Sequence, residues 1–427
     1  MMFRDRKTLF YFNQYFVIRL GEKIYKFDSK IESFPLIRSL FTLLFHAAKL
    51  LFKRQDTSIK KKYRHIVFIE TINQKNAILD VFNFMQNDRE EVLFIVNNGI
   101  TIDGFDNLQF NNRKAFLLGL FYWPKACCVS LRYTQRNKGI INRVHVLVNL
   151  SLFLSSEKIF NRYIEKTGAQ KIILTNDHNL QPLALLLSAK RKQVKSYYIQ
   201  HASVSSAFPK LLPDVSLLEG QQAIDTYNQI GNYSREIKLV GIARLDGILA
   251  YKKEYRTKDI TVGFCLKPYY SLELIREIIE AIKASNNVAE VILRPHPGNS
   301  AKFYRSLEQF NVSISNAKKE RPHEFIKRID VMISGESSII LEASLMKTKT
   351  IYIDDKIAQL DLYGFIKNRI TTFAQNLREI TQMLDTMDAS QIESQYANCG
   401  YYCSTVNTPF ENKSRELILN NLLYNDK

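Results

Sequence analysis

Two short stretches in the C-terminal half place polar side chains where an apolar strand pattern gives way to a helix pattern. In VILRPHPGNS (residues 291–300), Arg294 and His296 follow the apolar run and a Pro-Gly pair precedes the next helix. In VMISGESSIILEAS (331–344), the residues at this point are Ser334, Gly335, Glu336, Ser337 and Ser338. A helix N-terminus offers unpaired N–H groups and binds phosphate readily. The two stretches therefore predict a phosphate-binding site.

These stretches resemble the HP motif and the serine motif of GT-B glycosyltransferases that build bacterial surface polysaccharides. That group includes the sialyl-, polysialyl- and Kdo-transferases and the CDP-glycerol polymerases of teichoic acid synthesis. The resemblance implies that the nucleotide of an activated donor is held by Arg294, His296, Pro297, Ser334, Gly335, Glu336, Ser337, Ser338 and Lys267, the last after the strand ITVGFC. The alternatives are that His296 packs in a loop against Pro297, that the serines only cap a helix and that Lys267 is a surface lysine.

Polar residues also follow four predicted strands in the first half of the chain. They are Asn176, Asp177 and His178 after KIILT, Gln200 and His201 after SYYI, Glu219 after VSLL, and Arg244 and Asp246 after IKLVGIA. If the strands are parallel, all of these residues line one edge of a sheet and face the nucleotide site across a cleft.

The segment from YIQHASV to GIARLDG is again similar to this transferase group, in which a Gln-His-Gly element and a Gly-x-x-Arg-x-Asp element recur. Ala202 replaces the glycine after His201, so the backbone of that turn can differ. Some Kdo-transferases of similar sequence use an aspartate nucleophile, which implies that role for Asp246. The alternative is an ion pair with Arg244 or a cap of the turn that follows Asp246.

Glycosyl transfer requires a general base or a carboxylate nucleophile. Besides Asp246, Glu219 is the competing carboxylate, or it simply ends its strand. His201 can act as a base or as a donor to the leaving phosphate, with Asp177 orienting it. Asp177 and His178 can equally form a solvated turn.

The absence of a DxD element that holds a metal ion favours a metal-independent mechanism. Arg294, His296 and the serine helix terminus would then stabilise the leaving phosphate. We expect no metal and no cofactor, with the nucleotide-sugar donor as a co-substrate. No Walker loop and no GxGxxG sequence is present, which argues against P-loop NTPases and NAD enzymes.

Strand and helix patterns alternate twice along the chain and predict an α/β protein of the GT-B type, with two Rossmann-like domains whose parallel sheets face a central cleft. The predicted parts are a basic segment at 1–64, an acceptor domain at 65–250, a linker at 251–259, a nucleotide-donor domain at 260–405, and a helix at 406–427 that returns to the first domain.

The net charge of +18 is concentrated near the N-terminus, where residues 1–64 hold 15 Lys or Arg against 5 Asp or Glu. The apolar stretch 34–52 is interrupted by Arg38, His46 and Lys49, so it reads as an interfacial helix drawn to an anionic membrane surface. An amphipathic helix packed on the first domain is the alternative. We expect no nucleic-acid partner.

The five cysteines lack the spacing of a disulfide framework, and no signal peptide is visible, so we expect a cytoplasmic protein peripheral to the inner membrane. The resemblance implies transfer of Kdo or sialic acid from a CMP-activated donor to a glycan or glycolipid acceptor of capsule or lipopolysaccharide. The alternatives are a CDP-glycerol-type transferase, a UDP-sugar 2-epimerase and a non-enzymatic scaffold.

Overall fold

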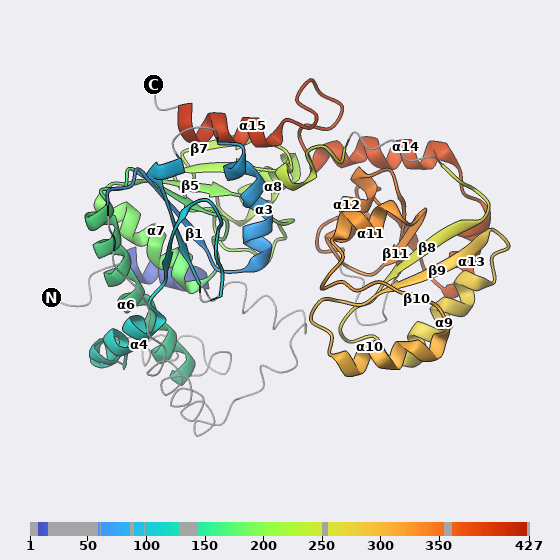
Figure 1. The fold of residues 1–427 in the computed structure, drawn as a ribbon, viewed down its shortest axis with the longest axis horizontal. Coiled ribbons are helices and arrows are strands. Elements are labelled where there is room, and N and C mark those ends of the chain that lie inside the picture. The colour runs from blue at the N-terminus through green and yellow to red at the C-terminus, as the bar shows by residue number, and fades with distance from the viewer. Residues whose placement is uncertain are drawn as a thin grey trace.

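The chain forms two α/β lobes that lie side by side, each with its own parallel sheet (Figure 1). The computed structural model describes residues 7–15, 59, 61–85, 89–97, 99–127, 143–249, 255–353 and 361–424. The apolar stretch predicted at 34–52 lies outside these residues. No helix in the described part of the chain is long and apolar enough to cross a membrane.

The first lobe is built on a seven-stranded sheet whose order is β3-β2-β1-β4-β5-β6-β7. Its strands are β1 (His65–Ile69), β2 (Val92–Val96), β3 (Asp106–Gln109), β4 (Lys171–Leu174), β5 (Lys195–Ile199), β6 (Val215–Leu218) and β7 (Glu236–Leu239). All neighbouring strands pair in parallel. Runs such as HIVFI and VLFIV are buried along their whole length, as expected for strands with helices on both faces.

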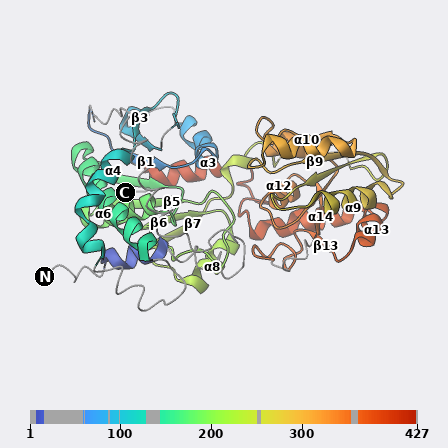
Figure 2. The same cartoon turned by 90° about the horizontal axis from the view of Figure 1, so that it is seen from below.

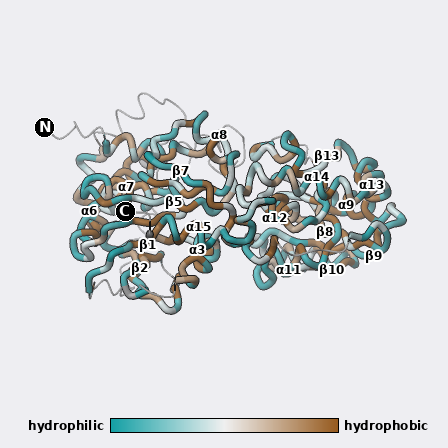
Figure 3. The backbone as a smooth tube through the Cα atoms, turned by 90° about the horizontal axis from the view of Figure 1, so that it is seen from above, coloured by the Kyte–Doolittle hydropathy of each residue, from teal (hydrophilic) through white to brown (hydrophobic). Residues whose placement is uncertain are grey.

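Helices cover both faces of this sheet. They are α3 (Ile72–Asn83), α4 (Asn112–Phe121), α6 (Arg143–Thr167), α7 (Leu180–Lys192) and α8 (Gln221–Ile230). A helix at 7–15 packs Phe12 against Phe153 of α6, with ring centroids 5.6 Å apart. Hydrophobic segments run through the interior of both lobes (Figure 3).

The second lobe holds a six-stranded parallel sheet with the order β10-β9-β8-β11-β12-β13. The strands are β8 (Ile260–Cys265), β9 (Val288–Arg294), β10 (Ser313–Ile314), β11 (Val331–Ser334), β12 (Lys349–Ile353) and β13 (Thr372–Ala374). The two parallel sheets, with helices between their strands, confirm the predicted α/β class. Residues 251–254, between the two sheets, lie outside the described part of the chain.

The second lobe is also covered on both faces, and Figure 2 shows its helices from below. Its helices are α9 (Leu272–Lys283), α10 (Ala301–Leu307), α11 (Pro322–Lys327), α12 (Ile339–Leu345), α13 (Leu377–Asp385) and α14 (Ala389–Asn398). Helix α9 is amphipathic, and its apolar face carries Ile275, Ile278 and Ile282. These side chains are buried in a hydrophobic core of the second lobe. Helices α12 and α14 pack in a different apolar cluster from α9.

After α14 the chain crosses back to the first lobe, where α15 (Ser414–Leu419) and η5 (Asn420–Tyr424) pack near α3 (Figure 1). The helix predicted within 406–427 begins only at Ser414, because turns occupy the residues before it. Charged side chains of the first lobe hold both ends of this returning C-terminal segment. The Asp246 carboxylate accepts the backbone N–H groups of Ser414 (3.1 Å) and Arg415 (2.7 Å), and the buried Lys171 ammonium donates to the Leu422 carbonyl. Both charges complement the helix dipole.

Two glycines of the first lobe allow the returning segment to pass close by. A Cβ atom on Gly220 would lie 2.4 Å from the carbonyl carbon of Tyr402, and one on Gly241 would lie 2.5 Å from the Thr405 hydroxyl. The Ser404 N–H also donates to the Glu219 carbonyl at 2.9 Å. The backbone of the returning segment therefore seals directly against the first lobe.

Substituting Gly220→Ala should destabilise the protein by about 2 kcal/mol or more, because the methyl group meets backbone atoms that cannot rotate away. Urea unfolding of the purified chain measures this. Gly400→Ala is the matched control, since a Cβ there meets nothing within 4 Å. Equal stability of the two variants would contradict the close packing.

Candidate functional site

The chain order of the second sheet reverses between β8 and β11, and this is where ligands bind in open α/β sheets. Lys267 follows β8, and Gly335 and Glu336 follow β11. A Cβ atom on Gly335 would lie 3.4 Å from Lys267 Cε and 2.6 Å from the Tyr270 hydroxyl oxygen. Glycine is therefore needed at this position, because it lets the Lys267 and Tyr270 side chains approach residues 334–338, which we call the serine stretch.

His296 lies on the loop after β9, which neighbours β8 on its other side. The Gly298 N–H donates to His296 Nδ1 at 3.1 Å, so the neutral ring carries its proton on Nε2. Partial burial and the nearby Lys267 ammonium lower the pKa of His296. The partly exposed imidazole is thus a neutral hydrogen-bond donor beside a lysine.

The serine stretch forms the third part of this edge. Ser338 is the N-cap residue of α12, and its hydroxyl makes no capping hydrogen bond. The Ser334 hydroxyl is buried and has no hydrogen-bond partner among the described residues. Burial and the neighbouring Asp361 raise the pKa of Glu336 to about 7, while its Oε2 accepts from the Leu362 N–H at 3.2 Å. Ser337 lies between these groups, partly exposed.

Arg294 does not face this edge as a free cation. Its side chain is buried, and its two Nη atoms donate to the Ser315 hydroxyl at 2.7 Å and to the Glu320 carbonyl at 3.0 Å. Its guanidinium also lies over the Phe325 ring. These contacts correct our expectation that Arg294 holds the donor phosphate: it anchors the loop that follows β10. Pro297 is exposed and lacks an N–H group.

The first sheet reverses its chain order between β1 and β4. Glu70 directly follows β1, and its carboxylate accepts a hydrogen bond from Asn179 Nδ2, at the start of α7, at 2.9 Å. Burial raises the pKa of Glu70 to about 7. We did not select Glu70 from the sequence, although an acidic residue directly after the strand HIVFI was a visible signal.

Asp177 and His178 lie at the same edge, after β4. The buried Asp177 carboxylate accepts the Tyr227 hydroxyl at 2.9 Å and lies 3.1 Å from His178 Nδ1. Asp177 therefore orients His178, not His201 as we expected. Burial and the nearby His178 and Arg244 lower the pKa of His201 to about 4, so its ring is neutral at physiological pH.

Glu219 and Arg244 link the two lobes. Arg244 Nη1 donates to Glu219 Oε1 at 2.6 Å, and Arg244 Nε donates to Glu342 Oε1 of α12 at 3.3 Å. Gln200 Nε2 also donates to Glu219 at 3.3 Å. Burial raises the pKa of Glu219, and the charge of Arg244 opposes that rise. The carboxyl edges of both sheets meet at this bridge. The Glu219 carboxylate is paired with Arg244 there.

Asp246 occupies a structural position. Both of its carboxylate oxygens accept backbone N–H groups at the start of α15, and its side chain is 4% exposed. The sequence left open a cap of the turn that follows Asp246; the carboxylate instead caps α15, 168 residues further along the chain. These contacts do not support our expectation that Asp246 is the catalytic carboxylate.

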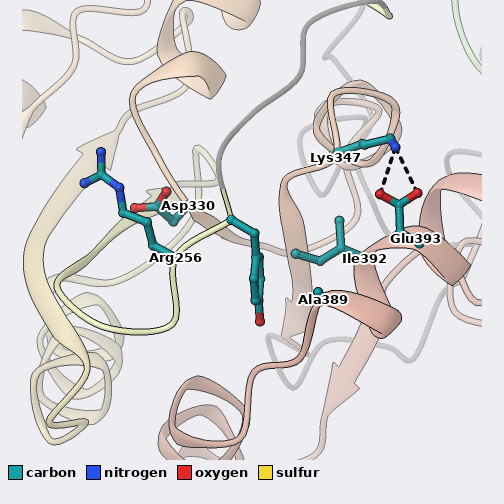
Figure 4. A pocket seen from close by; sticks show the side chains of 7 residues that line it. Arg256, Asp330, Lys347, Ala389, Ile392 and Glu393 are labelled. Carbon is teal, nitrogen blue, oxygen red and sulfur yellow. Dashed lines mark hydrogen bonds and ion pairs between the residues drawn. The ribbon is translucent and has the colours of Figure 1, made fainter.

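A hollow at the other edge of the second sheet is separate from these groups (Figure 4). It is lined by Tyr255, Arg256, Asp330, Lys347, Ala389, Ile392 and Glu393, near the amino ends of β8, β11 and β12. Lys347 and Glu393 form an ion pair at 2.8 Å on one side of it. In the described ranges, no cluster of three or more His, Cys, Asp or Glu side chains is suited to a metal ion.

Solved structures of known enzymes share the two-domain architecture. A complex of S. aureus MnaA with UDP is 14% identical, with 85% of this chain and 96% of that chain covered and a TM-score of 0.52. The UDP-GlcNAc 2-epimerase from Neisseria meningitidis bound to UDP-GlcNAc is 11% identical, with 84% and 100% covered and a TM-score of 0.52. The wall teichoic acid polymerase TagF with CDPG is 11% identical, with 90% and 96% covered and a TM-score of 0.50.

These similarities confirm the predicted two-domain GT-B fold. The three structures include a teichoic acid polymerase, as the sequence resemblance implied, but no CMP-sialic acid or Kdo transferase. No protein family and no curated protein matches the sequence.

Replacing Arg244 by Met should cost about 3 kcal/mol or more of stability, because Glu219 is left buried without its cation. The double variant Arg244→Met/Glu219→Gln should recover part of that loss in urea unfolding. Lys192→Met, which breaks the exposed pair with Glu165, is the control and should change little. No recovery in the double variant would contradict the bridge.

Proposed function

We propose that this chain is a metal-independent glycosyltransferase that moves a sugar from a nucleotide-activated donor to a glycan. The observation that carries the proposal is that Lys267, His296 and the serine stretch lie together at the switch point of the second sheet, the place where its strand order reverses. The solved structures of this fold with UDP, UDP-GlcNAc and CDPG support a nucleotide-bearing ligand.

The donor phosphate would be held by three kinds of group. Lys267 supplies positive charge, His296 supplies its Nε2–H, and Ser337 and Ser338 supply hydroxyl and backbone donors at the start of α12. These groups stand in place before reaction, so they stabilise the charge that develops as the sugar–phosphate bond breaks. A metal ion is not required in this scheme.

The charge of this edge favours CMP-activated donors such as CMP-Kdo or CMP-sialic acid. His296 is neutral because its pKa is lowered, and Arg294 is committed to its own loop. Among the described residues, Lys267 is the cation that acts on both His296 and Glu336. One lysine balances a donor with one phosphate charge better than a pyrophosphate with two.

The acceptor would bind at the carboxyl edge of the first sheet, which the Arg244 bridge joins to the donor edge. We propose a hydroxyl of a capsular or lipopolysaccharide glycan. His178 and the neutral His201 lie there and can position it. Asp177 acts through His178, because its carboxylate contacts that ring.

Two other reactions fit the same fold. A CDP-glycerol-type transferase is favoured by the similarity to TagF with CDPG, and a UDP-sugar 2-epimerase by the similarity to the Neisseria enzyme. An epimerase needs no acceptor and would release the 2-epimer of its substrate from the nucleotide sugar alone. Formation of that epimer would favour this alternative.

Thermal unfolding with CMP, CDP, UDP, GDP and ADP in the presence of EDTA tests the donor site. CMP should raise the melting temperature, since a ligand that binds only the folded state stabilises it. His296→Ala should weaken CMP binding by about 10-fold, because a hydrogen bond to a charged phosphate is lost. Lys267→Met should also weaken it.

The matched control is Lys283→Met, which removes the same charge from the far end of α9, at the opposite edge of the sheet. It should bind CMP like the wild type. A shift with CDP or UDP alone would favour the alternatives, and no shift with any nucleotide would remove the support for a donor site.

We also propose peripheral binding to an anionic membrane through the basic N-terminal region. Exposed apolar side chains on α4 support this: Phe121 is 83% exposed, with Leu117 and Leu120 beside it. Deleting 1–64 is a poor test, because the helix at 7–15 is part of the first core.

Replacing Lys53 and Arg54 by Gln should weaken binding to phosphatidylserine vesicles by about 30-fold, at about 1 kcal/mol per charge. Vesicle sedimentation measures this binding. Phosphatidylcholine vesicles are the control and should bind both proteins weakly. Unchanged binding to the anionic vesicles would show that these two charges make no contact with lipid.

A further inference from the structure

The centre of the first sheet carries a carboxyl group that the donor site does not use. Strands β1 and β4 are neighbours, although more than a hundred residues separate them, and Phe68 pairs with Leu174 near their carboxyl ends. Glu70 follows β1 and Asn179 follows β4, and their side chains meet at 2.9 Å. This contact therefore lies at the switch point, the place in such a sheet where a ligand enters.

Neutral groups hold the Glu70 side chain. The Glu70 N–H donates to Gln74 Oε1 at 2.7 Å, and the Gln74 side chain lies beside the Glu70 carboxylate. Gln74 is itself fixed by the capping box of α3 with Thr71. Asn179 and Gln74 thus fix the orientation of the carboxylate before any ligand arrives.

The titratable group that faces Glu70 is His178, whose Nδ1 is held by Asp177. In the described part of the chain, no lysine or arginine forms an ion pair with Glu70. Burial raises the pKa of Glu70 to about 7, although Asn179, His178 and Gln74 oppose the rise. A carboxyl group with this pKa gains and loses its proton near neutral pH, as a general base must.

The other carboxylates of this edge are committed elsewhere. Glu219 is paired with Arg244, Asp177 with Tyr227 and His178, and Asp246 with the start of α15. Each of these bonds stabilises the charged form or fixes a neighbouring element. Glu70 differs from them because amide groups hold it at the point where the strand order reverses.

We infer that Glu70 is the general base of the reaction, the group that takes the proton from the acceptor hydroxyl. This inference rests on the proposed transferase function. As the hydroxyl oxygen bonds to the anomeric carbon of the donor sugar, its proton passes to the Glu70 carboxylate. The bond from that carbon to the phosphate oxygen breaks, and the phosphate leaves with the electron pair. Asn179 and Gln74 are positioning residues in this step.

The first test needs no substrate and uses the full chain. Because the pKa of Glu70 is raised on folding, the folded protein binds more protons than the unfolded chain between about pH 4.5 and 7, and the charged carboxylate weakens the fold at higher pH. The melting temperature of Glu70→Gln should therefore be a few degrees higher than that of the wild type above pH 7. Near pH 5 the two melting temperatures should be equal. A lower melting temperature at every pH would overturn the inference.

The second test measures CMP released from CMP-sialic acid and from CMP-Kdo, with water as the acceptor. The wild-type rate should rise with pH through about 7, as the carboxylate forms. Glu70→Gln should lower the rate about 100-fold or more and remove this rise, while the thermal shift with CMP is kept. Glu336→Gln, at the donor edge, is compared for the pH dependence alone, because the Glu336 pKa is also raised to about 7; it should keep the rise, whatever its effect on the rate.

This comparison decides which carboxyl group produces the pH dependence. If Glu336→Gln removes the rise and Glu70→Gln keeps it, the inference is wrong. If the wild type shows no thermal shift with CMP, the proposed CMP-sugar function fails instead. The melting comparison of Glu70→Gln then still decides whether this carboxyl group titrates near neutral pH.

Discussion

The bridge from Glu219 through Arg244 to Glu342 is the interaction on which the arrangement of the two lobes depends. A guanidinium with two carboxylate partners satisfies charges that would be costly to bury alone. Arg244 follows the last strand of the first sheet, whereas Glu342 lies in α12, directly after the serine stretch. The bridge therefore joins the two edges where donor and acceptor would meet.

The returning C-terminal segment holds the same arrangement from outside. It passes over Gly220 and Gly241 at distances that exclude a side chain, and its helix is fixed between Asp246 and Lys171. Gly220 follows Glu219 directly, so the surface that seals the lobes lies beside the bridge. Packing and electrostatics thus fix one relative placement of the two sheets.

The carboxyl edges of both sheets carry groups whose charge is shifted towards neutrality. His296 and His201 have lowered pKa values, and Glu70 and Glu336 have raised ones, with burial as the main cause in each case. Neutral donors and a carboxyl group that titrates near pH 7 suit proton transfer and phosphate binding at physiological pH. The charges of Arg244, Arg294 and Asp246 hold the fold, whereas Lys267 stands at the donor edge.

The sequence by itself determined the α/β class, the two parallel sheets and the edge that carries the polar residues, because buried strands and helices have distinct apolar periods. It did not determine which polar residues remain available there. Arg294 and Asp246 looked functional, yet Ser315, Glu320 and the N–H groups of Ser414 and Arg415 occupy them. Glu70 was overlooked because its partner Asn179 is distant in sequence. Only tertiary structure pairs such residues, since hydrogen bonds and burial depend on contacts between separate strands.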